Sequence, residues 1–204
     1  MTIRQLSQKD KRLIGELAKL HKKAFPDFFL TQLGLPFLRT LYRGYLDDPE
    51  SGIIVAVENR KLAGFVAYSN DYPRFYKGLV KKKIIQFVWC SFLAALRHPS
   101  FTKRLLGALK KSEAVEKKEK YVELASICVD PETEGKGIGT KLVNRLKKQV
   151  DFDIYSYINL ETDADHNDKA NGFYVKNGFT LYRTYMTNEG RRMNEYRYSQ
   201  ETLK

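Results

Sequence analysis

The sequence is poor in cysteine and has no long apolar run, and these two absences narrow the class of protein. Only two cysteines, Cys90 and Cys128, occur in 204 residues, without the spacing of a disulfide framework. No apolar run reaches the roughly 20 residues that cross a bilayer. The first ten residues are too polar for a secretory signal. The sequence therefore predicts a cytoplasmic protein.

Acidic residues are also in deficit, because 36 Lys and Arg face 24 Asp and Glu, which gives a net charge of +12. Most of the excess lies in residues 72–118, where twelve Lys or Arg face two Glu, a net charge of +10. Hydrophobic content of 43% and aromatic content of 13% are typical of a globular protein. We therefore predict a single domain over residues 1–204, with a basic helical insertion at about 72–118.

Hydrophobic periodicity predicts a chain in which strands and helices alternate. The predicted elements are a strand at 2–6, helices at 10–24 and 35–46, strands at 53–57, 62–68 and 121–129, a helix at 139–150, a strand at 157–161, a helix at 168–177, and strands at 180–187 and 194–199. This order is typical of an α/β (α+β) domain with a mixed, mostly antiparallel central sheet and flanking helices. The basic insertion would separate the third and fourth strands.

A glycine-rich turn joins the predicted strand 121–129 to the predicted helix 139–150. It consists of Glu134-Gly-Lys-Gly-Ile-Gly139. Glycines allow the backbone to wrap closely around a ligand, and the N–H groups at the start of a helix favour an anion. The glycine order matches neither a P-loop nor a dinucleotide fingerprint. The turn therefore predicts a phosphate-binding site of another kind.

A second motif, Asn167-x-x-Ala170-x-x-Phe173-Tyr174-x-x-x-Gly178-Phe179, lies downstream of the glycine turn. Together with Val129-x-Pro131 and the turn itself, it resembles the GCN5-related N-acetyltransferase (GNAT) family over about residues 120 to 182. The resemblance implies acetyl-CoA as the cofactor, with its pyrophosphate on the glycine turn. It also implies the GNAT fold, in which two adjacent strands splay apart and admit the pantetheine arm.

The resemblance assigns a set of residues to the cofactor. The backbone of Ile127 and Val129 would pair with the pantetheine amides, and Asn167 would hydrogen-bond the same arm, although it could also cap the helix that follows. The glycine turn and the first helical residues would hold the pyrophosphate. The full set is Ile127, Val129, Glu134, Gly135, Lys136, Gly137, Ile138, Gly139, Thr140, Asn167 and Phe173.

Glu134 departs from the family pattern, which has Gln or Arg at this position. A carboxylate would then stand beside a pyrophosphate. Either its side chain turns to solvent and the backbone alone holds the phosphates, or the affinity for the cofactor is lowered. Lys136 and Lys141 could offset the negative charge.

Two residues are candidates for the proton transfers of acyl transfer. Strand alternation predicts that Glu123 shares a face with Ala125, Ile127 and Val129, where burial would make its carboxylate a better base. The alternative is a surface glutamate. The resemblance places a catalytic glutamate at this offset, and it makes Tyr174 the group that protonates the departing thiolate. A buried tyrosine with a structural hydrogen bond is the alternative for Tyr174.

Other polar residues are interpreted as having no catalytic role. Asp163, Asp165 and His166 make a weak metal site, so no metal is predicted. His21 and His98 are expected at the surface. Cys128 should face away from Ile127 and Val129, on the side of Ser126, so an acyl-cysteine route is not expected.

The resulting functional hypothesis is an N-acetyltransferase that moves an acetyl group from acetyl-CoA to a primary amine of a small molecule, by direct attack in a ternary complex. A nucleotide-linked amino sugar of polysaccharide synthesis is an alternative acceptor. Another alternative is a non-catalytic CoA-binding or membrane-surface regulatory protein, favoured by Glu134 and by the basic insertion.

The partners of the basic insertion stay open at this stage. Its helices could pack on the core, contact an anionic membrane surface, or form a wall for an anionic acceptor. No nucleic-acid motif accompanies the charge, so no specific nucleic acid is expected. We expect the acceptor to contact Phe25, Phe28, Phe29, the insertion and the last hairpin. A homodimer is also left open.

Overall fold

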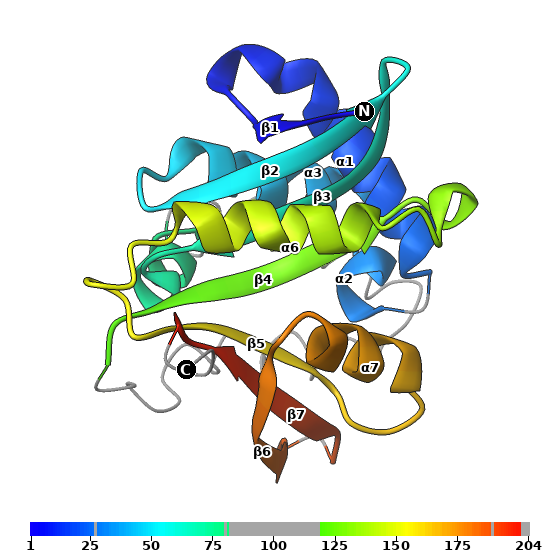
Figure 1. Ribbon diagram of the computed structural model, residues 1–204. Helices are drawn as coiled ribbons and strands as arrows, with labels where there is room; N and C mark the ends of the chain where they lie inside the picture. Colours follow the sequence, from blue (N-terminus) through cyan, green and yellow to red (C-terminus); the bar gives the residue numbers. More distant parts are fainter. Residues whose placement is uncertain (27, 80, 82–118, 189, 201–204) are drawn as a thin grey trace.

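The computed structural model describes residues 1–26, 28–79, 81, 119–188 and 190–200 (Figure 1). Within these residues, one mixed sheet has the strand order β1-β2-β3-β4-β5-β7-β6. All neighbouring strands are antiparallel except β4 and β5, which are parallel. The strands are β1 (Thr2–Gln5), β2 (Ser51–Glu58), β3 (Lys61–Ser69), β4 (Tyr121–Val129), β5 (Tyr157–Asp163), β6 (Thr180–Met186) and β7 (Arg192–Tyr198).

Helices cover both faces of the sheet (Figure 1). Among the described residues, the α-helices are α1 (Lys11–Ala24), α2 (Phe29–Gln32), α3 (Gly34–Asp47), α6 (Ile138–Gln149) and α7 (Asp168–Lys176), and residues 72–79 are also helical. Short 3-10 turns, η1 (Gln8–Asp10) and η3 (Pro131–Thr133), precede α1 and the glycine turn. On one face, α1 and α3 pack on β2 and β3; on the other, α6 packs on β3 and β4. The described residues therefore form two apolar clusters, one on each side of the sheet.

The sequence spacing of apolar residues explains both helical layers. In α1 the buried residues include Ile14, Leu17 and His21, and in α6 they include Leu142 and Leu146. A step of three or four residues places them on one helical face, which packs on the sheet. Burying each such leucine or isoleucine removes apolar surface from water and contributes about 1.5–3 kcal/mol.

The predicted fold class is confirmed: a mixed, mostly antiparallel sheet with flanking helices. Each predicted helix and strand begins and ends within two residues of the observed element. Of the predicted insertion, residues 72–79 and 81 are helical, and residues 82–118 lie outside the described residues. No helix in the described part of the chain is long and apolar enough to cross a membrane.

An irregularity in the sheet changes one predicted orientation. The register between β3 and β4 shifts, so that Ala67 pairs with Ser126 whereas Tyr68 pairs with Leu124. Ala125 is therefore an extra residue in β4, and a β-bulge of this kind interrupts strict alternation. Glu123 pairs with Ser69 and lies on the α1 and α3 side of the sheet, together with Cys128. The prediction that Glu123 shares a face with Ile127 and Val129 was wrong for this reason.

The parallel pairing between β4 and β5 is short. It comprises Tyr121 with Tyr157, Val122 with Ile158, and Glu123 with Asn159. Beyond Glu123, β4 continues along β3, whereas β5 continues along β7. The two strands thus part at Glu123, which is the splay that the resemblance implied.

Candidate active site

The glycine turn leads from β4 through η3 into α6 and leaves its backbone accessible. Gly135 and Gly137 have φ values of +79° and +70°, in the left-handed region that favours glycine. No heavy atom lies within 4 Å of a Cβ built at either position. The N–H of Lys141 donates to the Gly137 carbonyl (3.1 Å), so the N–H groups of residues 138–140 precede the regular helical bonding. These N–H groups and the helix dipole form a site for an anion.

Gly139 has a different role from the other two glycines. A Cβ at this position would lie 3.0 Å from Cε2 and 3.1 Å from Cζ of Phe173, and 3.6 Å from Val129. The glycine therefore allows the Phe173 ring of α7 to pack directly on the start of α6. Phe173 holds α7 against the glycine turn, and its predicted role beside the cofactor stays a prediction.

The Glu134 side chain is turned toward α7. Its carboxylate pairs with Nζ of Lys169 at 2.6 Å, and both side chains are exposed, at 53% for Glu134 and 79% for Lys169. Lys136 points to Glu58 at the end of β2, with 4.0 Å between Nζ and Oε2. Lys169, which the sequence analysis did not single out, is therefore the cation that offsets Glu134. The only signal in the sequence was the position of Lys169, two residues after Asn167 in the second motif.

Asn167 sits at the N-cap position of α7, but its side chain does not cap the helix. The amide nitrogen Nδ2 donates to Oγ1 of Thr162 (2.7 Å) and to the Asp163 carbonyl (3.2 Å). These bonds anchor the side chain to the end of β5. The side-chain oxygen remains as the acceptor, which suits a contact with an amide N–H of a pantetheine arm.

Glu123 is buried at the end of the parallel pairing. Its Oε2 accepts a hydrogen bond from Nδ2 of Asn159 at 2.8 Å. Burial chiefly, and the Glu123 charge in part, raise the pKa of Tyr45, Tyr72 and Tyr121, which surround this carboxylate. The predicted burial of Glu123 is therefore found, on the face opposite to the predicted one.

Tyr174 of α7 is buried on the α6 side of the sheet. Its ring packs edge-on against Phe173 (5.4 Å between centroids) and Phe179 (6.0 Å), and lies tilted against Tyr196 (5.9 Å). Burial raises the pKa of its hydroxyl, so the group stays protonated at neutral pH. Tyr174 and Glu123 thus lie on opposite faces of the sheet.

Residues 126–129 of β4 follow the predicted alternation, whereas Ala125, at the bulge, packs on the α1 side instead of the predicted face of Ile127 and Val129. Ile127 and Val129 pack on the α6 side, while Cys128 is buried on the α1 side and its Sγ donates to the Leu20 carbonyl (3.6 Å). Burial raises the pKa of Cys128 to about 12. The thiol is therefore protonated at neutral pH and poorly nucleophilic.

His21 was expected at the surface, and that prediction was wrong. It is 3% exposed, because helical spacing places it on the same face of α1 as Leu17. Its Nδ1 lies 2.6 Å from the Tyr42 hydroxyl, and its ring packs against Phe25 and Phe28. Both phenylalanines are partly exposed, so they remain available for the predicted acceptor contact. His98 lies outside the described residues.

Of the three residues considered as a weak metal site, both carboxylates are engaged with arginines. Asp163 accepts three hydrogen bonds from the Arg191 guanidinium, and Asp165 pairs with Arg192 at 3.3 Å. No group of three or more metal-ligating side chains occurs in the described part of the chain.

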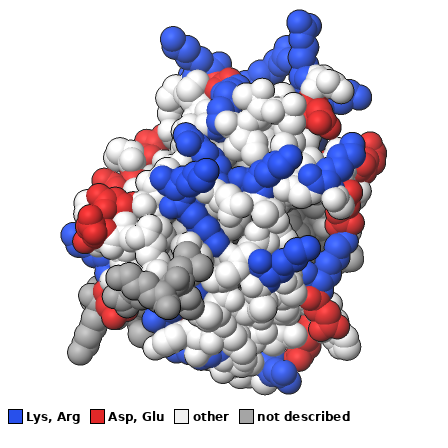
Figure 2. Space-filling view, in the orientation of Figure 1, with Lys and Arg blue, Asp and Glu red and all other residues white. Residues whose placement is uncertain are grey.

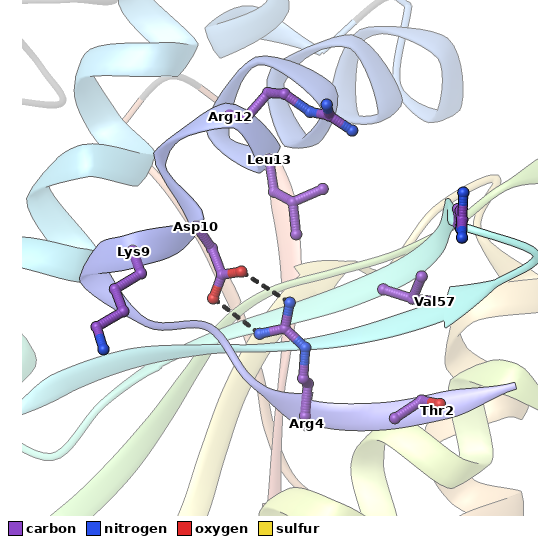
Figure 3. Close-up of a pocket in the computed structure, with 8 residues that line it drawn as sticks. Thr2, Arg4, Lys9, Asp10, Arg12, Leu13 and Val57 are labelled. Carbon is purple, nitrogen blue, oxygen red and sulfur yellow. Dashed lines mark hydrogen bonds and ion pairs between the residues drawn. The ribbon is translucent and has the colours of Figure 1, made fainter.

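A shallow cavity lies at the β1 edge of the sheet (Figure 3). In its centre, Arg4 donates to both oxygens of Asp10, each at 2.8 Å, and holds the pKa of Asp10 far below its usual range. The carboxylate is thereby fixed in an ion pair and unsuited to proton transfer. The cavity is lined by Thr2, Arg4, Lys9, Asp10, Arg12, Leu13, Val57 and Arg60.

Comparison with protein families identifies the domain. The model of the acetyltransferase (GNAT) family matches residues 15–179, which is most of the chain. The chain belongs to the GNAT family. The resemblance that rested on two motifs is therefore confirmed. The search of curated protein sequences gave no match.

Solved GNAT structures share this fold at low sequence identity. A putative GNAT acetyltransferase from Desulfovibrio desulfuricans is 15% identical, with a TM-score of 0.61 over 97% of this chain and 98% of its own. An aminoglycoside 6'-N-acetyltransferase complexed with coenzyme A is 16% identical, with a TM-score of 0.63 over 98% and 97%. Arabidopsis thaliana NAA60 in complex with acetyl-CoA is 15% identical, with a TM-score of 0.59 over 98% and 98%.

Positive charge spreads over the face of this GNAT domain that carries α6 (Figure 2). The helix itself contributes the exposed side chains of Lys141, Arg145 and Lys148, which lie on one helical face. Such a surface raises the local concentration of anionic ligands near the glycine turn.

Proposed function

We propose that this protein is an acetyl-CoA-dependent N-acetyltransferase that acts on a primary amine of a small molecule, by direct attack in a ternary complex. One observation carries the proposal. The anion-binding glycine turn follows the end of β4, and β4 and β5 part at Glu123, whose buried carboxylate lies on one face of the sheet while the buried Tyr174 lies on the other.

The residues around the glycine turn fit the cofactor. Open N–H groups at the start of α6 suit a pyrophosphate, Lys169 neutralises Glu134, and the Asn167 oxygen suits a pantetheine amide. Two related GNAT structures were solved with coenzyme A or acetyl-CoA, which supports the same ligand for this chain. When bound, acetyl-CoA supplies the acetyl group as a thioester, with a thiolate as the leaving group.

Glu123 is the proposed base. An amine enters as an ammonium ion and must lose a proton before its lone pair can attack. The buried carboxylate of Glu123 takes this proton, directly or through a water molecule. The freed lone pair then forms the new bond from nitrogen to the acetyl carbon, while the bond from that carbon to sulfur breaks.

Tyr174 is the proposed acid. Its protonated hydroxyl donates its hydrogen to the departing thiolate, and the second hydrogen lost by the amine nitrogen replaces it on the phenol oxygen. The products are an amide, a free thiol and one proton carried by Glu123. Burial raises the pKa of Tyr174, so the hydroxyl carries its proton at neutral pH and can act as a donor.

Thiol release from acetyl-CoA in the presence of a panel of amines tests this function. We expect turnover with at least one primary amine, and saturable acetyl-CoA binding by calorimetry at micromolar concentrations. Binding without turnover for any amine would favour the alternative of a non-catalytic CoA-binding protein. Absence of binding would contradict both functions.

Tyr174→Phe tests the proton donor. We expect turnover to fall by roughly 100-fold or more, the usual contribution of a positioned general acid, with unchanged affinity for acetyl-CoA. Tyr196→Phe is the matched control, because it removes a hydroxyl from the same aromatic cluster, one that donates to Asn171 at 3.0 Å. Equal turnover in the two variants would remove Tyr174 from the proton-transfer step.

A further inference from the structure

The side chain of Asn159 is buried beside the proposed base, and its amide oxygen has no hydrogen-bond partner in the described structure. Asn159 pairs with Glu123 across β4 and β5, at the last residue pair before the strands part. It is 1% exposed. Its Nδ2 donates to Oε2 of Glu123 at 2.8 Å, while its Oδ1 has no hydrogen-bond partner in the described structure.

The orientation of this amide follows from chemistry. An ionised carboxylate can only accept hydrogen bonds, so the NH2 group of Asn159 must face Glu123 and its oxygen must point elsewhere. A buried carbonyl oxygen without a donor destabilises the folded protein, and native structures rarely contain one. An unsatisfied acceptor next to the base is therefore evidence for a donor that arrives with a ligand.

The neighbouring groups do not supply that donor. Arg197 faces Asn159 from β7, but its Nη2 donates to Glu195 (3.0 Å) and its guanidinium stacks 4.1 Å from the Tyr157 ring centroid and 3.3 Å from that of Tyr182. The guanidinium is engaged in these contacts and donates no hydrogen bond to the oxygen of Asn159. The donor that fits is small, carries several N–H groups and binds beside a carboxylate.

We propose that Asn159 orients the acceptor amine, with its Oδ1 accepting one N–H of the nitrogen whose proton Glu123 removes. This proposal rests on the proposed acetyltransferase function. A primary ammonium has three hydrogens. One goes to Glu123, one is lost as the amide forms and ends on sulfur through Tyr174, and the third stays on nitrogen as the amide N–H. The third hydrogen is the one that Asn159 holds.

The arrangement makes Asn159 a specificity determinant as well as a positioning residue. An N-methylated amine has only two hydrogens on its ammonium nitrogen, and both are lost in the reaction. None remains for Oδ1, so the buried oxygen stays unsatisfied as the amide forms. A site built to hydrogen-bond a substrate group strongly rejects an analogue that lacks it. Primary amines should therefore be strongly preferred over their N-methyl counterparts.

The test compares kcat/KM for a primary amine with that for its N-methyl derivative, using the best amine of the panel. In the unmodified protein we expect a ratio of about 100 or more. Asn159→Ala should lower this ratio at least about tenfold, because alanine offers no acceptor, while acetyl-CoA affinity stays unchanged. Asn194→Ala is the control, because the amide of Asn194 is satisfied by Asn171 and Thr184.

Asn159→Asp separates the two halves of the amide. The carboxylate keeps an acceptor but loses the donor to Glu123, so the preference for primary amines should persist. The acidic limb of the pH–rate profile should move to higher pH, because a second negative charge opposes ionisation of the base. If Asn159 had only a structural role, the Asp variant would not combine an unchanged preference for primary amines with a shifted pH–rate profile.

Two results would overturn the proposal. One is an Asn159→Ala variant that turns over substrate with the original preference for primary amines, which would mean that Oδ1 binds only water. The other, if the alanine variant does not fold, is loss of that preference in Asn159→Asp. Absence of any acetyl transfer by the unmodified protein would instead refute the proposed function, and the role of Asn159 with it.

Discussion

At the scale of residues, the proposed chemistry depends on polar side chains held in an apolar interior. Glu123 and Asn159 lie on one face of the sheet and Tyr174 on the other. Burial keeps the Tyr174 hydroxyl protonated, whereas the N–H of Asn159 stabilises a charged carboxylate. An acid and a base can thus coexist at one pH because their surroundings differ.

His21 is a buried histidine that makes stability depend on pH. Burial lowers the pKa of His21 to about 4, from an ordinary value near 6.5. The folded state therefore binds this proton less readily than the unfolded state. The contribution of neutral His21 is fully present above pH 6.5 and is lost as the pH falls toward 4.

We predict that the free energy of unfolding falls by about 2–3 kcal/mol between neutral pH and about pH 4.5 through His21 alone. In His21→Gln, which can still hydrogen-bond Tyr42, this component should be absent. Urea denaturation of both proteins at the two pH values measures the difference. Equal pH dependence in His21→Gln and the unmodified protein would contradict the burial of a neutral His21.

At the scale of elements, α7 and the start of α6 form one unit around the glycine turn. The Phe173 ring covers Gly139, and Lys169 pairs with Glu134. One contact is apolar and the other ionic, and both come from α7. The position of α7 therefore decides both the shape and the charge of the proposed phosphate site.

Glu134 and Lys169 should affect cofactor affinity in opposite directions. Glu134→Gln removes an anion beside the proposed pyrophosphate and should tighten acetyl-CoA binding by about two- to five-fold, the range expected for an exposed charge. Lys169→Ala leaves Glu134 uncompensated and should weaken binding by a similar factor. Calorimetry at low salt measures both effects, which should shrink as salt is added.

The double variant is the control for this pair. If Lys169 acts mainly by neutralising Glu134, its loss should cost less affinity when residue 134 is already Gln. Strictly additive effects would show that the two side chains act independently on the cofactor. Unchanged affinity in all three variants would place the phosphates elsewhere.

At the scale of the whole molecule, the sheet has two parts, which are joined by the short parallel pairing of β4 with β5. Strands β1–β4 carry α1, α3 and α6, while β5, β7 and β6 carry α7. Only three residue pairs join β4 to β5. A ligand that contacts both the glycine turn and α7 would tie the two parts together.

We therefore predict that acetyl-CoA stabilises the fold. At 100 times its Kd, a ligand that binds only the folded state adds about 2.7 kcal/mol to the free energy of unfolding. For a chain of this size, that corresponds to a rise in Tm of roughly 5–10 °C. Thermal denaturation with and without ligand measures the shift.

Acetyl-pantetheine, which lacks the pyrophosphate, is the matched ligand control for the thermal shift. At equal concentration it should raise Tm much less, because the N–H groups of the glycine turn would have no anion to bind. Equal shifts would mean that the glycine turn does not hold the phosphates.

Local patterns in the sequence were sufficient to predict the elements and their order. Apolar spacing marked α1 and α6, and the glycine turn with the Asn167–Phe179 motif predicted the family that residues 15–179 match. The same spacing places His21 on the buried face of α1, with Leu17, so the apolar pattern of the helix contained the signal that the surface prediction missed.

What the sequence determined by itself was the set of local features: strand and helix periods, turn glycines and the residues of two motifs. These follow from backbone conformation and from neighbours along the chain. The tertiary structure alone decided the face of Glu123, the pairing of Glu134 with Lys169, and the place of Asn159 beside the base. Each of these depends on contacts between distant segments. A single bulge at Ala125 reverses a strand face, and no local pattern encodes it, because the register is set by packing on both sides of the sheet.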